Sequence, residues 1–425
     1  MTSSIEYAQQ LDSADPLKDF RTQFIIPTGN GKPKIYFLGN SLGLQPKSTK
    51  GYITTILEDW ALLGVEAFFE GRNPWLSYHE QLIYPLADIV GAKPHEVVVM
   101  NQLTVNLHLL MISFYKPTGK RNKIICEAKA FPSDQYVFET QVKHYGFDPL
   151  KTIVEIAPRK GEDHIRTEDI VRAIEECGDS LALVLMGGVN YYTGQLFDIA
   201  AITRSAHAAG AKAGFDLAHA AGNVDLQLHE WNVDFATWCS YKYLNSGPGA
   251  VAGAYVHERY HQDKSLERFA GWWGYNKAER FQMRPGFDPV IGAEGWQLST
   301  PSLILYACHK AALELFARAG MKPLLEKSRL MSEYIFFLLH QIQRNSYDTY
   351  KILTPADPSA RGCQVSLLFV RDGRMIFDFL KRQDIFADWR EPNVIRIAPV
   401  PLYNTFEEIF LFASALQTAI DHSRS

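Results

Sequence analysis

Short apolar runs alternate with longer amphipathic stretches through the middle of the chain. The apolar runs predict strands at Glu96–Met100, Lys123–Glu127, Leu181–Met186, Ala213–Asp216, Phe235–Cys239 and Val251–His257, and runs this apolar are typical of strands covered on both faces. Helices are expected over Thr104–Tyr115, with Thr104 as N-cap, from Phe131 to His144, and over Asp198–Ala209, where Gly210 would end the helix. The alternation predicts an α/β fold with a mostly parallel central sheet and helices on both faces.

The two ends of the chain follow other patterns. Residues 1–60 predict an N-terminal arm with a polar helix, a strand at Lys34–Leu38 and a turn-rich segment at Gly39–Pro46, and a helical pattern then runs from Thr49 to Phe69. The last 120 or so residues predict helices over Ser302–Ala319, Leu324–Gln343 and Met375–Gln383, and strands at Gln364–Arg371 and Asn393–Ala398. We therefore expect a large domain at 61–305 and a smaller α+β domain at 306–425, with the arm at 1–60 associated with the smaller one.

Composition and charge favour a globular protein that acts on small molecules. The 425 residues are 47% hydrophobic, and 43 basic against 47 acidic residues leave a net charge of −4. This balance gives no electrostatic reason to expect nucleic acid or an anionic membrane surface as a partner. No apolar run approaches the roughly 18 residues that cross a bilayer, and the first 20 residues lack a secretory apolar core. We expect a cytoplasmic protein.

The cysteines change this picture little. Five cysteines are scattered without paired spacing, at positions 126, 177, 239, 308 and 363. Neither a disulfide framework nor a zinc site is indicated, so we expect reduced thiols and no bound metal.

Candidate chemistry appears where two predicted strands end. Asp216 closes one strand, and Lys242 follows another about 25 residues later. Pyridoxal phosphate needs both groups, because a lysine amine forms a Schiff base with its aldehyde and a carboxylate keeps its ring nitrogen protonated. Each residue alone also fits a structural role, the lysine at a strand end and the aspartate as a helix N-cap. Both follow the carboxyl ends of strands, where α/β sheets bind ligands, and this favours a cofactor site.

Four further residues allow a binding role or a structural one. The helix start at Thr104 follows a strand, as in phosphate sites, and Ser41 lies in a glycine-rich turn where it could bind an anion or serve as an ordinary turn serine. Phe131 could stack on an aromatic ring or pack against its neighbours. Arg396 alternates with isoleucines in a predicted strand, so it is either a salt-bridged surface residue or a fork for a carboxylate.

Several motifs in register resemble the kynureninase family. They are Asn101–Thr104, Phe131–Asp134, Tyr192–Gln195, Asp216–His219, Tyr241-Lys242 and Gly271-Trp272. The resemblance extends from Phe37–Gln45 to Ile397–Asn404, which is nearly the whole chain. Linked motifs in the same order and spacing are far more specific than any one of them.

The resemblance implies a homodimer of the aspartate-aminotransferase fold with pyridoxal phosphate on Lys242. Asp216 would bind the pyridine nitrogen with His219 beside it, and Phe131 would stack on the ring. The other implied cofactor positions are Leu103, Thr104, Pro132, Ser133, Asp134 and Tyr241, together with Trp272 and Thr300 of the neighbouring subunit. Ser41 and Arg396 would bind the substrate carboxylate, and Phe68 would line the substrate pocket.

The family reaction is hydrolysis of a carbon–carbon bond in kynurenine, which yields anthranilate and alanine in tryptophan breakdown. The residues suit these steps, because the Lys242 amine can remove the α-proton and Tyr241 can donate a proton to the β-carbon. We expect loss of Lys242 to cost more activity than loss of Tyr241.

Three positions depart from family patterns. Position 187 is Gly where some relatives carry a hydroxyl, so one cofactor contact is missing or comes from water. Positions 68 and 300 are Phe and Thr, where animal enzymes that prefer 3-hydroxykynurenine have His and Asn. Because Phe68 cannot hydrogen-bond a ring hydroxyl, we expect a modest preference for kynurenine.

Two other functions stay open on the sequence alone. One is a different enzyme of the same fold, such as a cysteine desulfurase that uses Cys363 as persulfide carrier, although a cysteine that starts an apolar strand is more often a packed core residue. The other is a non-catalytic protein that binds pyridoxal phosphate, against which the intact Asp216, Tyr241 and Lys242 argue.

Overall fold

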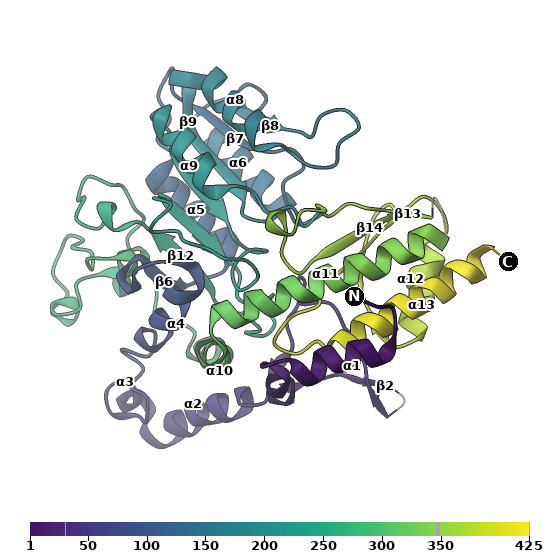
Figure 1. Ribbon diagram of the computed structural model, residues 1–425. Coiled ribbons are helices and arrows are strands. Elements are labelled where there is room, and N and C mark those ends of the chain that lie inside the picture. Colours follow the sequence, from purple (N-terminus) through teal and green to yellow (C-terminus); the bar gives the residue numbers. More distant parts are fainter. Residues whose placement is uncertain (30, 346–348, 425) are drawn as a thin grey trace.

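The two largest sheets, each with its own helices, form the centres of two units (Figure 1). A computed structural model describes residues 1–29, 31–345 and 349–424. The chain enters at the smaller unit, forms the larger unit in its middle, and returns to the smaller unit through the long helices α10 (Leu303–Ala319) and α11 (Met321–Asn345). The first and last helices, α1 (Ile5–Ala14) and α13 (Phe406–Arg424), lie side by side in that smaller unit.

The larger sheet has seven strands in the order β6-β12-β11-β10-β9-β7-β8. Their bounds are β6 Val97–Met100, β7 Lys123–Glu127, β8 Ile153–Ile156, β9 Leu181–Gly187, β10 Lys212–Asp216, β11 Phe235–Trp238 and β12 Ala252–Val256. Only β12 runs antiparallel to its neighbours, since all other pairs are parallel. The expected mostly parallel sheet is confirmed.

Side chains of these strands enter two cores in alternation, as a sheet covered on both faces requires. Val97 and Val99 pack in one core with helices α4 (Glu80–Val90), α8 (Thr167–Cys177), α9 (Ile199–Ala208) and α10. Val98 and Met100 pack in the other core with helices α5 (Leu103–Phe114) and α6 (Pro132–His144). The helices therefore cover both faces, and the strand ends stay open at one edge.

The smaller sheet is antiparallel, with the order β13-β14-β17-β16. Its strands are Tyr350–Ile352, Val365–Phe369, Val394–Ile397 and Asp388–Arg390 in that order. Helices α1, α11, α12 (Gly373–Arg382) and α13 supply the apolar residues that pack with this sheet. Position 396 lies in β17, in register with Ser366 on one side and Asp388 on the other.

The N-terminal segment joins the two units. Strand β4 (Ile35–Tyr36) pairs in parallel with β15 (Ile385–Phe386), and β1 (Phe24–Ile25) pairs with β5 (Gln45–Pro46). The following helix α2 (Thr49–Leu63) packs against α10. Because Gly64 has φ +55 and ends α2, the expected single helix to Phe69 divides, and α3 covers Ala67–Glu70.

Most expected strands and helices are found within two or three residues of their predicted ends. The prediction of Thr104 as N-cap is wrong, because Gln102 holds that position and Thr104 lies in the first turn of α5. Strand β8 was not expected, since its partly exposed residues lack the apolar pattern of the other strands. None of the helices in the described ranges has an apolar stretch sufficient to cross a bilayer.

Candidate active site

A cavity of about 200 Å³ opens at the carboxyl edge of the larger sheet. Its walls come from the ends of β7, β9 and β10, the first turns of α5 and α6, and the loop after β11. The lining residues are Leu103, Thr104, Glu127, Phe131, Ser133, Asp134, Gly187, Val189, Tyr191, Asp216, Ala218, His219, Cys239, Tyr241 and Lys242. This is where ligands bind in α/β sheets.

Lys242 enters the cavity from the loop that follows β11. The N-terminal segment fixes this loop, because the backbone N–H of Gly43 donates to the Tyr241 carbonyl at 2.8 Å. The Lys242 amine lies 2.9 Å from Nε2 of His219. A protonated lysine can only donate, so His219 accepts at Nε2 and carries its own proton on Nδ1. Burial lowers the pKa of His219 well below its usual value, which keeps this imidazole neutral.

Asp216 closes β10 beside Gly187 of β9 and Thr237 of β11. Its side chain is buried, and Oδ1 accepts the backbone N–H of Ala218 at 2.7 Å. Burial raises the pKa of Asp216, whereas the Ala218 N–H and the Lys242 charge lower it. The carboxylate is thus fixed at the cavity wall by the Ala218 N–H and by a hydrogen bond with Asp134.

Two further buried carboxyl groups flank Asp216. Burial raises the pKa of Asp134 well above its usual value, and the charge of Asp216 and a hydrogen bond to it add to the effect. Burial also raises the pKa of Glu127 to about 7. The charge of Lys242 in the same cavity lowers the pKa values of Asp134 and Asp216 and so opposes the effect of burial.

The two helix N-termini at the cavity suit an anion. Leu103 and Thr104 form the first turn of α5, and Ser133 lies in the first turn of α6. Neither helix has a side-chain hydrogen bond at its N-cap, so backbone N–H groups of the first turns are open to a ligand. The positive ends of two helix dipoles there favour a phosphate group.

Tyr241 lies beside Lys242 on the same loop and lines the cavity. Burial raises the pKa of Tyr241, and contact with Cys239 raises it further. The phenol therefore keeps its proton at neutral pH and can act as a donor.

Arg396 is a buried cation at the border between the two units. Its side chain is 0% exposed, which excludes the surface salt bridge considered from the sequence. The guanidinium donates to the Tyr191 carbonyl and to the carboxylate of Asp388, while Nε has no partner among the described atoms. Burial lowers its pKa to about 10, so it remains charged at neutral pH. Tyr191 also lines the Lys242 cavity, which brings the arginine next to that site.

Five other expected site residues lie outside the cavity wall. They are Ser41, Phe68, Pro132, Trp272 and Thr300. Pro132 is the first residue of α6, and Ser41 is exposed on the loop that contains Gly43. Trp272 and Thr300 are exposed, and Phe68 is half-buried against Trp75 with ring centroids 5.2 Å apart.

Several cavity residues were not expected from the sequence. They are Glu127, Val189, Tyr191, Ala218 and Cys239. Glu127 ends a predicted strand as Asp216 does, so the same strand-end rule would have identified it. Tyr191 lies in a loop, and its carbonyl accepts hydrogen bonds from Arg396 and Gln364 of the smaller unit. No local sequence pattern indicates the position of Tyr191.

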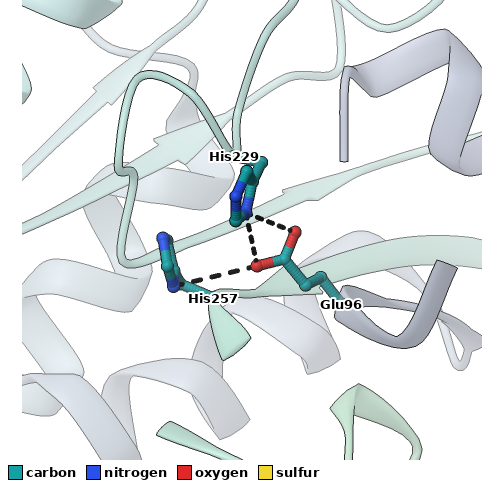
Figure 2. Close-up of side chains that lie close together, drawn as sticks. All are labelled: Glu96, His229 and His257. Carbon is teal, nitrogen blue, oxygen red and sulfur yellow. Dashed lines mark hydrogen bonds and ion pairs between the residues drawn. The ribbon is translucent and has the colours of Figure 1, made fainter. Parts of the chain in front are cut away.

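A second cluster of polar side chains has a structural arrangement (Figure 2). Buried Glu96 lies 3.0 Å from Nδ1 of His229 and accepts the backbone N–H of Glu258 at 2.8 Å. Nδ1 of His257 lies 3.7 Å from Glu96 and accepts the Arg259 N–H at 3.2 Å. The two imidazoles are stacked, with centroids 5.1 Å apart and planes at 26°, so their in-plane lone pairs do not converge on one ion. The cluster links β6 and β12 to the loop between β10 and β11.

The Lys242 cavity fits pyridoxal phosphate. A lysine amine, a fixed carboxylate and two helix N-termini are the groups that this cofactor requires. Asp134 Oδ1 and His219 Nδ1 are buried without hydrogen-bond partners among the described atoms, as expected where a bound group would complete the contacts.

Comparison with solved structures agrees with this fold. A cystine C-S lyase variant with glycine linked to its pyridoxal phosphate superposes with a TM-score of 0.75 at 18% identity, covering 90% of this chain and 96% of its own. A cysteine desulfurase from Thermococcus onnurineus gives 0.77 at 17% identity, covering 95% and 98%. At such low identity, the similarity shows the fold alone.

Sequence comparison is more specific. A model of the kynureninase C-terminal domain matches residues 324–416. A kynureninase of Flavobacterium johnsoniae is 56% identical over 415 residues, and one of Flavobacterium psychrophilum is 55% identical over 418, each covering 98% of both chains. With this identity over nearly the full length, the chain belongs to the kynureninase family.

Proposed function

We propose that this protein hydrolyses L-kynurenine to anthranilate and L-alanine with pyridoxal phosphate attached to Lys242. The observation that carries the proposal is one cavity that holds the Lys242 amine, the Asp216 carboxylate and two helix N-termini. Membership of the kynureninase family supports the reaction.

The bound cofactor would supply an electron sink next to the substrate amine. Lys242 would serve as the base that removes the substrate α-proton, and His219 accepts a hydrogen bond from its amine. Asp216 would keep the ring nitrogen of the bound cofactor protonated. These roles need the three side chains in one water-poor pocket, and Asp216 and His219 are both buried.

Tyr241 and Arg396 act on the substrate itself. The Tyr241 phenol, which keeps its proton, donates to the β-carbon after the carbon–carbon bond breaks. We assign Arg396 to the substrate carboxylate, because its buried Nε has no hydrogen-bond partner among the described atoms. Ser41 is assigned to the same carboxylate, and its loop is joined to Tyr241 through the N–H of Gly43.

The direct test is anthranilate release. Protein reconstituted with pyridoxal phosphate should produce anthranilate fluorescence and alanine in equal amounts when kynurenine is added. The Lys242→Ala variant should produce neither product. A wild-type holoenzyme without this activity would leave a non-catalytic cofactor-binding protein as the better description.

A homodimer belongs to the same proposal. Exposed apolar side chains gather on α2, α3 and the segment 272–291; they include Trp60, Leu62, Val65, Phe69, Trp272, Phe281, Met283 and Ile291. Phe281 contacts both Phe69 and Trp272, with ring centroids 6.1 and 5.6 Å apart, which joins α3 to the 272–291 segment. Exposed apolar surface of this kind is typical of a subunit interface. Trp272 and Thr300 would then reach the partner's cofactor.

Cysteine desulfurase activity has little support at Cys363. This thiol is buried, and burial raises its pKa to about 12. A persulfide carrier must attack as an exposed thiolate, which Cys363 cannot do.

Cellular location and domain limits complete the proposal. None of the five cysteines, all within the described ranges, forms a disulfide, which supports the cytoplasm. Separate apolar cores around the two sheets support a division into a larger and a smaller domain, for which we propose the limits 61–305 and 306–425. Helix α10 packs in the larger core, and the arm at 1–60 contributes apolar side chains to both cores.

A further inference from the structure

Glu127 is a buried carboxyl group in the cofactor cavity without a role in the steps above. It is the last residue of β7, and its side chain lines the same cavity as Asp216 and Lys242. The residue is only 4% exposed. Burying a carboxyl group costs free energy, so its position requires compensation by hydrogen bonds or by a ligand.

The backbone of Gly187 fixes this carboxyl group. Both carboxyl oxygens of Glu127 lie 3.1 Å from the Gly187 N–H. A Cβ at position 187 would lie 2.8 Å from Oε1 of Glu127. The glycine therefore leaves the space that the Glu127 carboxyl group occupies, which gives a physical reason for glycine at a position where some relatives carry a hydroxyl.

The groups that face Glu127 are mostly acidic. Asp216 lies near enough for its charge to raise the pKa of Glu127, after burial, which is the larger cause. The charge of Glu127 in turn raises the pKa values of Asp134 on α6 and of Cys126 on its own strand. From β9, the backbone N–H of Gly187 lowers the pKa of Glu127.

We propose that Glu127 is a positioning residue for the cofactor, which adds negative charge behind Asp216 and strengthens the hold of Asp216 on a protonated pyridine nitrogen. The inference rests on the cofactor assignment of the proposed function. Glu127 acts through Asp216 and need not touch the ring.

This role has a defined pH dependence. Ionised Glu127 favours a cationic ring, so cofactor binding should lower the pKa of Glu127 from about 7 and release part of a proton near neutral pH. The gain in cofactor affinity is therefore present above this pKa and lost below it. A glutamine at position 127 keeps the shape and an acceptor for the Gly187 N–H but lacks the charge.

The experiment compares dissociation constants of cofactor-free wild type and Glu127→Gln. Pyridoxal phosphate should bind the variant about tenfold more weakly at about pH 8 and within about twofold at about pH 6. The probe that isolates the charge effect is the cofactor analogue with a C–H group in place of the ring nitrogen. Both proteins should bind this analogue equally.

Glu155→Gln is the matched control, since Glu155 lies opposite Cys126 on the neighbouring strand and is exposed. It should bind both probes as wild type does. Equal weakening of both probes by Glu127→Gln would show a packing defect and overturn the proposal. Unchanged affinity for pyridoxal phosphate at about pH 8 would overturn it as well.

A second measurement avoids the variant if it does not fold. Wild type should release more protons at about pH 7 on binding pyridoxal phosphate than on binding the analogue, and equal release would contradict the proposal. Cofactor binding is measured without kynurenine. A wild type that binds the cofactor but makes no anthranilate would therefore refute the proposed function and leave this inference intact.

Discussion

The amine of Lys242 lies 2.9 Å from Nε2 of His219, which is a buried, neutral imidazole. Burial, followed by the charges of Lys242 and Arg396, lowers the pKa of His219. A neutral imidazole beside the lysine accepts a hydrogen bond without adding positive charge to the pocket. The lysine is therefore held in place by an acceptor that carries no charge.

His219→Phe should lower kcat about tenfold, because the ring volume is kept but the acceptor for the Lys242 amine is lost. Cofactor attachment to Lys242 should persist, as measured by mass spectrometry after borohydride reduction. If kcat is unchanged in the variant, the hydrogen bond between His219 and the Lys242 amine has no role in catalysis.

Arg396→Lys should raise KM for kynurenine at least about tenfold and change kcat less, because an ammonium cannot bind a carboxylate with two parallel hydrogen bonds. Arg390→Lys is the control, since Arg390 contacts the same Asp388 at 3.2 Å but is 38% exposed. Steady-state kinetics distinguish the two. Equal effects of both variants would indicate that the ion pairs with Asp388, rather than carboxylate binding, determine KM.

Phe68→His should shift the ratio of kcat/KM values toward 3-hydroxykynurenine by about tenfold, because a histidine can hydrogen-bond the ring hydroxyl. Wild type should prefer kynurenine. The neighbouring Phe69→His, at a residue that is 52% exposed, should leave the ratio unchanged. A wild type that favours the hydroxylated substrate would contradict the role assigned to Phe68.

Asp234→Asn should reduce the free energy of unfolding by about 2 kcal/mol near neutral pH. Burial alone would raise the pKa of Asp234, but hydrogen bonds and charge from His207, Arg259 and Tyr260 hold it at about 2. Because the pKa is depressed in the folded protein, the stabilisation exists above the unfolded value and is lost as pH falls from about 4 toward 2.

Denaturant titrations of wild type and Asp234→Asn at several pH values check this. Their difference should begin to shrink below about pH 4. The exposed Asp225→Asn control should match wild type throughout. A constant difference down to about pH 3 would mean that the charge of Asp234 is not the cause.

Leu62→Glu should dissociate the proposed dimer, because this side chain is 83% exposed within the apolar surface on α2 and α3. Light scattering should show monomers with an unchanged circular dichroism spectrum, and activity should fall with the loss of the partner's Trp272. Leu150→Glu, at a residue that is 94% exposed elsewhere, should leave the mass unchanged. A wild-type monomer would refute the dimer.

The sequence could indicate Asp216 and Lys242 because each follows an apolar strand, and strand ends in a parallel sheet share one edge. It could not show whether the face of Arg396 is covered. That burial depends on contacts such as the one with Tyr191, which is 205 residues away in the sequence and belongs to the larger unit. The sequence also could not show the role of Gly187. The space beside this glycine is occupied by the side chain of Glu127, which lies 60 residues earlier in the chain.

Both ends of the chain belong to one unit. The side chain of Asp12 accepts the backbone N–H groups of Phe406 and Glu407 at 2.7 and 2.9 Å, and α1 packs against α13. During synthesis on a ribosome, the strands between Val97 and Val256 can assemble as soon as they emerge. Helix α1 must wait, with its apolar side exposed, until α13 has been translated.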